Sequence, residues 1–307
     1  MQTLTEIKHL LESRGLRPKK SLGQNFLVDQ NLIRKLVDCS GVGAGSLVLE
    51  VGPGTGTLTE ELLARGCEVV ACELDDDLAS LLAERIPAML GPGKQHRFTL
   101  VLGDCLEGKR TLSPLITQAL GGRPFALVAN LPYAAATPLM STLLVDHPEC
   151  PTLAVTIQRE VAERLGAAPG GKDYGALAVL AQSLAQVRPI ATLPRECFWP
   201  RPDVTSAMVL LSRRAEPLVA DPAALSAFLR DLFAHRRKQI GAVLGKGTDW
   251  ETVAAAPGCG EITPMLRAEQ LSVPQVVALG RALGRLEGRG TSANNARPNP
   301  RSTSHEV

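Results

Sequence analysis

The residues that decide the fold are LVLEVGPGTG, positions 47–56, an apolar run that ends in a loop containing three glycines. Short runs rich in Val and Leu are typical of strands that a parallel sheet buries on both faces. The glycines let a ligand approach the backbone without meeting a Cβ atom, and residues 57–65 follow with a helical pattern that Gly66 closes. Because a strand, a glycine loop and a helix in this order begin a doubly wound α/β sheet, we expect a ligand site where the strand ends.

Similar units continue on the C-terminal side of this stretch, where apolar runs alternate with helical segments as far as residue 157. The predicted strands of the sheet are 47–50, 68–72, 99–102, 125–129 and 153–157. Asp29 is expected to cap a helix that runs to residue 36, and a helix at 78–85 is expected to end before Pro87. Beyond residue 157 the pattern predicts short helices at 158–165 and 174–186 and a late strand at 204–211.

The composition changes near residue 216, and the pattern then predicts amphipathic helices at 222–237 and 274–286. The last twenty or so residues are rich in Ser, Thr, Asn, Pro and Arg and have no apolar periodicity, which is typical of disorder. We therefore expect four parts: an N-terminal helical cap at 1–45, a sheet domain at 46–216, a small α-helical domain at 217–287 and a disordered tail at 288–307.

The composition narrows the class of protein. The chain has 307 residues, of which 45% are hydrophobic, enough for a large core and about two domains. Its net charge is only +2, but both ends are basic: residues 1–40 hold 7 basic and 4 acidic groups, and residues 221–307 hold 11 and 8. Seven cysteines without a C-x-x-C pair, and no histidine at metal-binding spacing, argue against a disulfide framework and a metal site. No signal-peptide core or membrane-length apolar stretch is present, so we expect a cytoplasmic protein without membrane contact.

Glu73 follows the second predicted strand, 17 residues after Gly56. An acid at that position can accept hydrogen bonds from both hydroxyls of a ribose. The loop has the spacing G-x-G-x-G instead of G-x-G-x-x-G, and Pro53 removes a backbone N–H that a pyrophosphate would use. A ligand with a ribose and no phosphate, such as S-adenosylmethionine, therefore fits better than a dinucleotide. The alternative is a glycine turn that serves only the strand-to-helix geometry.

Two further polar motifs follow the third and fourth predicted strands. Asp104 comes after the third, where its carboxylate can accept the amino hydrogens of an adenine ring, although Gly-Asp is also an ordinary turn. The fourth strand ends in Asn130-Leu131-Pro132-Tyr133. An exocyclic amine such as adenine N6 is a poor nucleophile, and the Asn130 side-chain oxygen and the Leu131 carbonyl can accept its two N–H bonds. Tyr133 offers a face on which an extruded base can stack, although a strand-ending turn with a packed tyrosine is the alternative.

Together with further motifs, these residues make the sequence resemble the bacterial 16S rRNA (adenine N6,N6)-dimethyltransferase family. The resemblance runs from about residue 19 to residue 244 and includes KSLGQNFL at 20–27, the glycine loop, Glu73, GDCL at 103–106, NLPY at 130–133, QREVAERL at 158–165, KDYG at 172–175, F-x-P-x-P-x-V-x-S at 198–206 and RRK at 236–238. It implies a Rossmann-like class I S-adenosylmethionine-dependent methyltransferase sheet, the α/β domain at 46–216, with a small C-terminal all-α domain at 217–287 that contacts RNA.

The resemblance also implies a role for each matching residue. The residues implied to bind S-adenosylmethionine are Asn25 and Leu27, which close over it, Gly52 and Gly54 beside its methionine part, Glu73 at its ribose, Asp104 at its adenine and Asn130 where it meets the target amine. The residues implied to act on the target adenine are Asn130, Leu131, Pro132, Tyr133 and Phe198, with the two aromatic rings on its opposite faces. No metal is implied.

The family's reaction transfers two methyl groups to N6 of each of two adjacent adenosines in the 3′-terminal hairpin of 16S rRNA during assembly of the 30S subunit. The implied partner is 16S rRNA in the pre-30S particle, and we expect the enzyme to be a monomer. The chain departs from the family pattern at Ala134, Ala135, Thr205 and Ala242. These departures concern contacts with the target and leave the cofactor pocket intact.

Two alternatives remain open at this point. One is the related class of 23S rRNA adenine N6-methyltransferases that confer macrolide resistance, although Leu131 in place of Ile and the KDYG segment argue against it. The other is a non-catalytic RNA-binding assembly factor that retained the fold. Short basic clusters at 19–20, 213–214 and 236–238 suit a split RNA-binding surface, which all of these functions would need.

Overall fold

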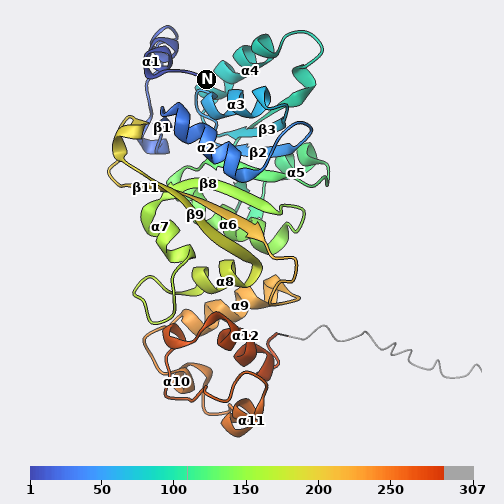
Figure 1. Cartoon of the computed structure of the whole chain (residues 1–307), viewed down its shortest axis with the longest axis vertical. Helices are drawn as coiled ribbons and strands as arrows, with labels where there is room; N and C mark the ends of the chain where they lie inside the picture. Colours follow the sequence, from blue (N-terminus) through green and yellow to red (C-terminus); the bar gives the residue numbers. More distant parts are fainter. Residues whose placement is uncertain (109, 287–307) are drawn as a thin grey trace, which may run out of the picture.

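The computed structural model describes residues 1–108 and 110–286 of the chain. A sheet covered by helices occupies one end and the middle, and the C-terminal helices gather at the opposite end (Figure 1). The tail expected at 288–307 lies outside the described residues. Within the described ranges, no helix combines the length and the apolar character needed to cross a bilayer.

A seven-stranded sheet forms the centre of the molecule. Its strands are β2 (Leu47–Val51), β3 (Glu68–Glu73), β4 (Phe98–Leu102), β7 (Ala126–Asn130), β8 (Thr152–Gln158), β9 (Ala185–Leu193) and β11 (Ser206–Arg213). They lie in the order β4-β3-β2-β7-β8-β11-β9. The first five are parallel, and β11 runs antiparallel to both of its neighbours, β8 and β9. Because the order of the strands reverses between β2 and β7, a crevice is expected at their carboxyl ends.

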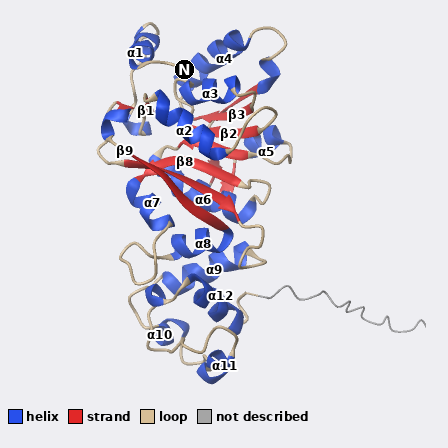
Figure 2. Ribbon diagram, viewed as in Figure 1, coloured by secondary structure: helices blue, strands red, loops and turns tan. Residues whose placement is uncertain are grey.

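Helices cover both faces of this sheet (Figure 2). One face carries α2 (Gln30–Ser40), α3 (Thr57–Ala64) and α4 (Asp76–Leu90), and the other carries α5 (Pro114–Leu120), α6 (Tyr133–Asp146), α7 (Arg159–Leu165) and α8 (Ala176–Leu184). Successive residues of a strand point to opposite faces, so Val48 packs with the first group of helices whereas Leu47 and Leu49 pack with the second. Both faces are apolar, which is why the central strands read as continuous hydrophobic runs.

The C-terminal helices continue the core of the second face. They are α9 (Pro222–Phe233), α10 (Ile240–Leu244), α11 (Trp250–Ala255) and α12 (Val273–Ala282), and α9 packs against α8 and α6. Tyr174 is fully buried at the junction and its hydroxyl donates to the Leu271 carbonyl at 2.8 Å. Arg236 donates to the carbonyls of Lys172 and Tyr174, so part of one predicted basic cluster holds the two regions together.

The remaining elements lie at the edges of the sheet domain. They are α1 (Leu4–Glu12), a short pair formed by β1 (Phe26–Leu27) and β10 (Phe198–Trp199), and a hairpin formed by β5 (Leu106–Glu107) and β6 (Thr111–Leu112). In the β1–β10 pair, Phe26 lies opposite Trp199 and Leu27 lies opposite Phe198. This pair joins the N-terminal region to residues near 200, far away in sequence.

The five strands predicted in the parallel part and the Asp29 cap of α2 are confirmed. The helix predicted at 174–186 is wrong at its end, because α8 stops at Leu184 and β9 begins at the next residue. No strand is predicted at β9, which contains Pro189 and lies at the edge of the sheet, where a residue without an N–H is tolerated. The expected end before Pro87 is also wrong, since α4 continues to Leu90, and α9 ends at Phe233, before residue 237.

Candidate active site

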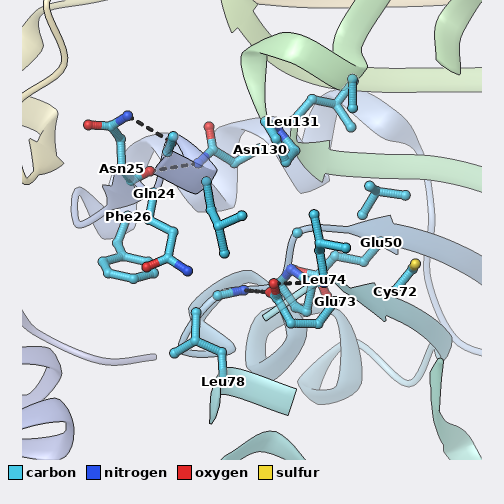
Figure 3. Close-up of a pocket in the computed structure, with 18 of the residues that line it drawn as sticks. Gln24, Asn25, Phe26, Glu50, Cys72, Glu73, Leu74, Leu78, Asn130 and Leu131 are labelled. Carbon is cyan, nitrogen blue, oxygen red and sulfur yellow. Dashed lines mark hydrogen bonds between the residues drawn. The ribbon is translucent and has the colours of Figure 1, made fainter. Parts of the chain in front are cut away.

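A cavity of about 580 Å³ opens at the carboxyl ends of β2, β3, β4 and β7 (Figure 3). Its size is in the range of pockets that hold small molecules. The glycine loop, the ends of the four strands, the start of α6 and the segment 20–27 line it. All site residues predicted from the sequence contribute to its wall: Asn25, Leu27, Gly52, Gly54, Glu73, Asp104, Asn130, Leu131, Pro132, Tyr133 and Phe198.

The glycine loop is in close contact with two other parts of the wall. Gly52 and Gly54 have φ angles of +72° and +61°, a conformation that favours glycine. A Cβ atom at Gly54 would lie 2.8 Å from a ring carbon of Phe26, and one at Gly52 would lie 3.0 Å from Cγ of Pro132. Both glycines are therefore required by the backbone and by the space, and a side chain at either would push the wall of the cavity apart.

Glu73 ends β3 and is 5% exposed. Its Oε2 accepts a hydrogen bond from the Gly54 N–H at 3.1 Å, and its Oε1 accepts from the N–H groups of Leu74 and Asp75 at 2.9 and 3.0 Å. Burial raises the pKa of this carboxyl above its usual value, although the three backbone donors act in the opposite direction. A carboxylate offers about four acceptor positions, so one position on Oε2 is left for a ligand hydroxyl.

Asp104 follows β4 and is exposed at the rim of the cavity. One of its oxygens accepts from the Leu106 N–H at 3.0 Å, which fixes the side chain at the turn before β5. The hydrogen bond leaves the second oxygen of the carboxylate available for a donor group. Glu73 and Asp104 thus stand at the ends of two adjacent strands, β3 and β4, as the sequence predicts.

A strap formed by residues 19–27 covers part of the cavity. Asp75, which is 3% exposed, accepts hydrogen bonds from Lys19 Nζ and from Gln24 Nε2, both at 2.6 Å. Burial acts to raise the pKa of Asp75, but these two donors outweigh it and hold the pKa below its usual value. The C-terminal end of the strap is β1, which pairs with β10. The sequence analysis did not predict this anchoring. The only signal for it is that Lys19 precedes the 20–27 motif and that Gln24 lies within the motif.

Asn130 ends β7 and points toward the strap (Figure 3). Its Nδ2 donates to the backbone carbonyl of Asn25 at 3.1 Å, and this bond fixes which way the amide faces. The Asn25 side chain turns away and donates to the Gly23 carbonyl at 2.9 Å. The Asn130 Oδ1 is consequently left as an acceptor at the cavity wall.

The two residues after Asn130 contribute through their backbone. The Leu131 side chain is 2% exposed and packs in the core, while its N–H donates to the Thr156 carbonyl at 3.0 Å. No residue in the described parts of the chain donates a hydrogen bond to the Leu131 carbonyl. Pro132 immediately precedes α6 and caps it without a side-chain hydrogen bond. The Leu131 carbonyl is therefore a second free acceptor next to Asn130 Oδ1.

The two aromatic residues of the predicted site differ in exposure. Tyr133 begins α6, is half-buried, and its hydroxyl lies 2.7 Å from Ser206 Oγ. Phe198 lies in β10 opposite Leu27 and is only 3% exposed, so it forms part of the packed wall. Of the two aromatic residues in the lining, Tyr133 is therefore the more exposed.

Sequence reasoning assigned no role to Glu50, although it belongs to the decisive stretch. It lies in β2, is 1% exposed and accepts a hydrogen bond from the Thr59 hydroxyl at 2.7 Å. Burial raises its pKa to about 8. An acid inside an apolar run was the available signal. The lining also holds the carboxyl groups of Glu73 and Asp104, which suit a cationic ligand that carries hydroxyl groups.

Some residues of the predicted basic clusters are bonded within the fold, and others are exposed. Arg213 donates to the carbonyls of Leu143, Leu144, His147 and Cys150 and so fastens β11 to its surroundings. Lys19 is paired with Asp75 and Asp77. Arg237 and Lys238 are exposed. In the described residues no group of three His, Cys, Asp or Glu side chains is arranged to hold a metal ion.

Comparisons with known proteins agree with this geometry. The family model described as "Ribosomal RNA adenine dimethylase" matches residues 15–279. A protein of Streptomyces griseus subsp. griseus named "Ribosomal RNA small subunit methyltransferase A" is 39% identical over 280 residues, which cover 89% of this chain and 92% of that protein. A protein of the same name from Opitutus terrae is 40% identical over 266 residues, covering 85% and 92% of the two chains.

Two solved structures share the fold over most of the chain. A dimethyladenosine transferase from Plasmodium falciparum has a TM-score of 0.68 at 21% identity and covers 85% of this chain and 98% of its own. The 23S rRNA methyltransferase ErmE has a TM-score of 0.63 at 27% identity and covers 84% and 99%. The sheet and its covering helices are thus those of class I methyltransferases, as the sequence predicts.

Proposed function

The chain belongs to the ribosomal RNA adenine dimethylase family and is therefore an S-adenosylmethionine-dependent rRNA methyltransferase, and we propose that it dimethylates N6 of two adjacent adenosines in the 3′-terminal hairpin of 16S rRNA. It acts on assembling 30S subunits in the cytoplasm, as a monomer. One observation carries the proposal. Asn130 gives its N–H to the strap, and in the described residues neither its Oδ1 nor the carbonyl of the next residue, Leu131, accepts a hydrogen bond, so both acceptors are available in the lining of the cavity.

The wall of the cavity fits the methyl donor. The backbone of Gly52 and Gly54 lines the cavity without side chains, and this suits the methionine part. The open acceptor position of Glu73 suits a ribose hydroxyl, and the free oxygen of Asp104 suits the amino group of an adenine. When bound, S-adenosylmethionine supplies an electrophilic methyl group on a sulfonium. Asn25 and Leu27 belong to the strap that would hold it in place.

The target side follows from Asn130 to Tyr133. Asn130 Oδ1 and the Leu131 carbonyl accept the two N–H bonds of the target amine, which turns the nitrogen lone pair toward the cavity. No side chain has to remove a proton before the attack, so the residues act by orientation and proximity. Tyr133 stacks on the extruded base, a contact worth roughly 1–3 kcal/mol. Phe198 is part of the β1–β10 pair and lines the same cavity.

Each part of the chain has its own role in the proposed function. Residues 1–45 cap the cofactor, residues 46–216 carry methyl transfer, and residues 217–287 contact the ribosomal RNA. The strap supports the first assignment, because it belongs to the N-terminal part and lines the cavity. The exposed Arg237 and Lys238 support the third. Binding to RNA through such residues is expected to weaken steeply as salt is raised.

Methyl transfer to defined ribosomal particles tests the function. The purified chain is incubated with radiolabelled S-adenosylmethionine and immature 30S particles from a strain that lacks the modification, with modified 30S particles as the control. We expect label only in the unmodified particles, in the 3′-terminal fragment of 16S rRNA and as dimethyladenosine. Label in 23S rRNA would establish the related 23S activity instead. Binding of the cofactor without any labelled RNA would establish a non-catalytic assembly factor.

Asn130→Ala tests the role of the amide. We expect turnover to be abolished, because one of the two acceptors for the target amine is removed. Cofactor affinity should change by no more than roughly tenfold, about 1.4 kcal/mol, since the strap keeps its bonds to Asp75. Turnover is measured with labelled donor and affinity by calorimetry. A variant with near-normal turnover would refute the amine-orienting role.

A further inference from the structure

The Tyr133 ring is fixed at both of its ends. Its backbone begins α6 directly after Pro132, and its hydroxyl lies 2.7 Å from Ser206 Oγ. A tyrosine side chain has two rotatable bonds, so a fixed backbone and a fixed hydroxyl leave the ring only the freedom to flip about its own axis. The half-buried ring thus stands at the cavity in one orientation.

Ser206 is itself held rigidly. It is the first residue of β11, where it lies opposite Gln158 of β8 on one side and opposite Leu193 of β9 on the other. Its side chain is fully buried. Tyr133 is the only hydrogen-bond partner of its hydroxyl among the described residues. Because an unpaired buried hydroxyl is costly, this partnership is expected to persist.

The two residues that follow Tyr133 in α6 are small. Ala134 is exposed and Ala135 is partly buried, and both side chains end at Cβ. Burial raises the pKa of the Tyr133 hydroxyl, which keeps it in the neutral form that can donate.

We propose that Ser206 is a positioning residue that holds the Tyr133 ring ready for the target adenine. This inference rests on the proposed function, in which that ring stacks on the extruded base. A ring already ordered loses little conformational freedom when a base stacks on it, whereas a free ring must be ordered at the moment of binding. Loss of the Ser206 hydroxyl should therefore weaken productive RNA binding and leave cofactor binding unchanged.

A double-variant cycle separates positioning from mere packing. Ser206→Ala, Tyr133→Phe and the double variant each lack the same hydrogen bond and keep the ring. We expect each to lower kcat/KM for unmodified 30S particles by the same factor, about three- to tenfold, as for the loss of one hydrogen bond. Ser206→Ala should then cost nothing further in the Tyr133→Phe background. All three should bind S-adenosylmethionine as the wild type does.

Ser183→Ala is the matched control. Ser183 is also a fully buried serine, but it lies in α8 and its hydroxyl has no hydrogen-bond partner in the described residues. Its replacement should leave kcat/KM unchanged, which separates the effect of the Tyr133 contact from the loss of any buried hydroxyl. Thermal unfolding of every variant checks that the fold is kept.

A fluorescent base reports the ring directly. A 16S hairpin RNA with 2-aminopurine at the target position changes its emission when the base stacks on an aromatic ring. We expect weaker quenching with Ser206→Ala than with the wild type. Wild-type activity of Ser206→Ala, or an equal loss in both Tyr133 backgrounds, overturns the positioning role alone. Absence of rRNA methylation by the wild type overturns the proposed function and the inference together.

Discussion

Replacing Glu50 with Gln should remove a pH-dependent loss of stability. The side chain is 1% exposed and has one hydrogen-bond partner, the Thr59 hydroxyl at 2.7 Å. Burial raises its pKa from 4.5 to about 8. Between these two values the folded protein binds a proton that the unfolded chain has lost. Below about pH 4.5, Glu50 therefore makes its whole contribution to the free energy of unfolding. This contribution is lost as the pH rises from 4.5 through about 8.

The size of the effect follows from the same shift. At about 1.4 kcal/mol for each pH unit, an interval of roughly 3.5 units corresponds to at most about 5 kcal/mol of unfolding free energy. Gln is neutral at every pH and keeps an oxygen that can accept from Thr59. The wild-type curve of unfolding free energy against pH should thus fall away from the Glu50→Gln curve as the pH is raised.

Urea unfolding of the two proteins from pH 5 to pH 8.5 measures this divergence. Glu107→Gln, a change at an exposed carboxylate, is the control and should give a curve parallel to the wild type. Parallel curves for Glu50→Gln and the wild type would refute the reasoning, because they would mean that Glu50 is ionised in the folded protein throughout this range.

Three further predictions concern the cavity wall. Glu73→Ala removes an acceptor of three backbone N–H groups and of the proposed ribose contact, so calorimetry should find S-adenosylmethionine affinity roughly ten- to hundredfold lower. Gly54→Ala places a Cβ atom 2.8 Å from the Phe26 ring at a φ of +61°, a strain of about 1–2 kcal/mol, and should lower both Tm and cofactor affinity. Asp75→Asn removes the charge that pairs with Lys19, so amide hydrogen exchange in the strap and release of the cofactor should both become faster. Asp77→Asn, at a half-exposed side chain, is the control and should change both rates far less.

The parallel part of the fold could be predicted because a strand that is buried on both faces has a recognisable run of apolar residues. The central strands β2 and β7 are mainly apolar runs, interrupted only by Glu50 in β2 and ended by Asn130 in β7, and turn residues separate each from the next helix. The edge strand β9 has no such run, since it holds Gln186, Arg188 and Pro189 and buries little of its surface. Its place in the sheet is set by pairing with β11, and that pairing depends on residues about twenty positions away.

The candidate site could be predicted where it depends on strand ends. Glu73 and Asn130 end their strands and Asp104 follows one, and parallel pairing brings such residues to one edge of the sheet irrespective of the loops between them. The strap could be placed only through the resemblance, because its anchors span about fifty residues or more. The bond from Asn130 to Asn25 also ends on a backbone carbonyl, which every residue has, and so leaves no mark in the sequence.

An amide at position 130 is explained by one contact that the structure shows and one that the proposed function adds. The strap presents a carbonyl, which needs a donor, and a target amine presents N–H groups, which need an acceptor. A carboxylate could serve the amine, but it would face the Asn25 carbonyl with a second negative oxygen and push the strap away. A hydroxyl would reach only one of the two partners. The amide can satisfy both, because its Nδ2 donates to the strap and its Oδ1 is left for the proposed target amine.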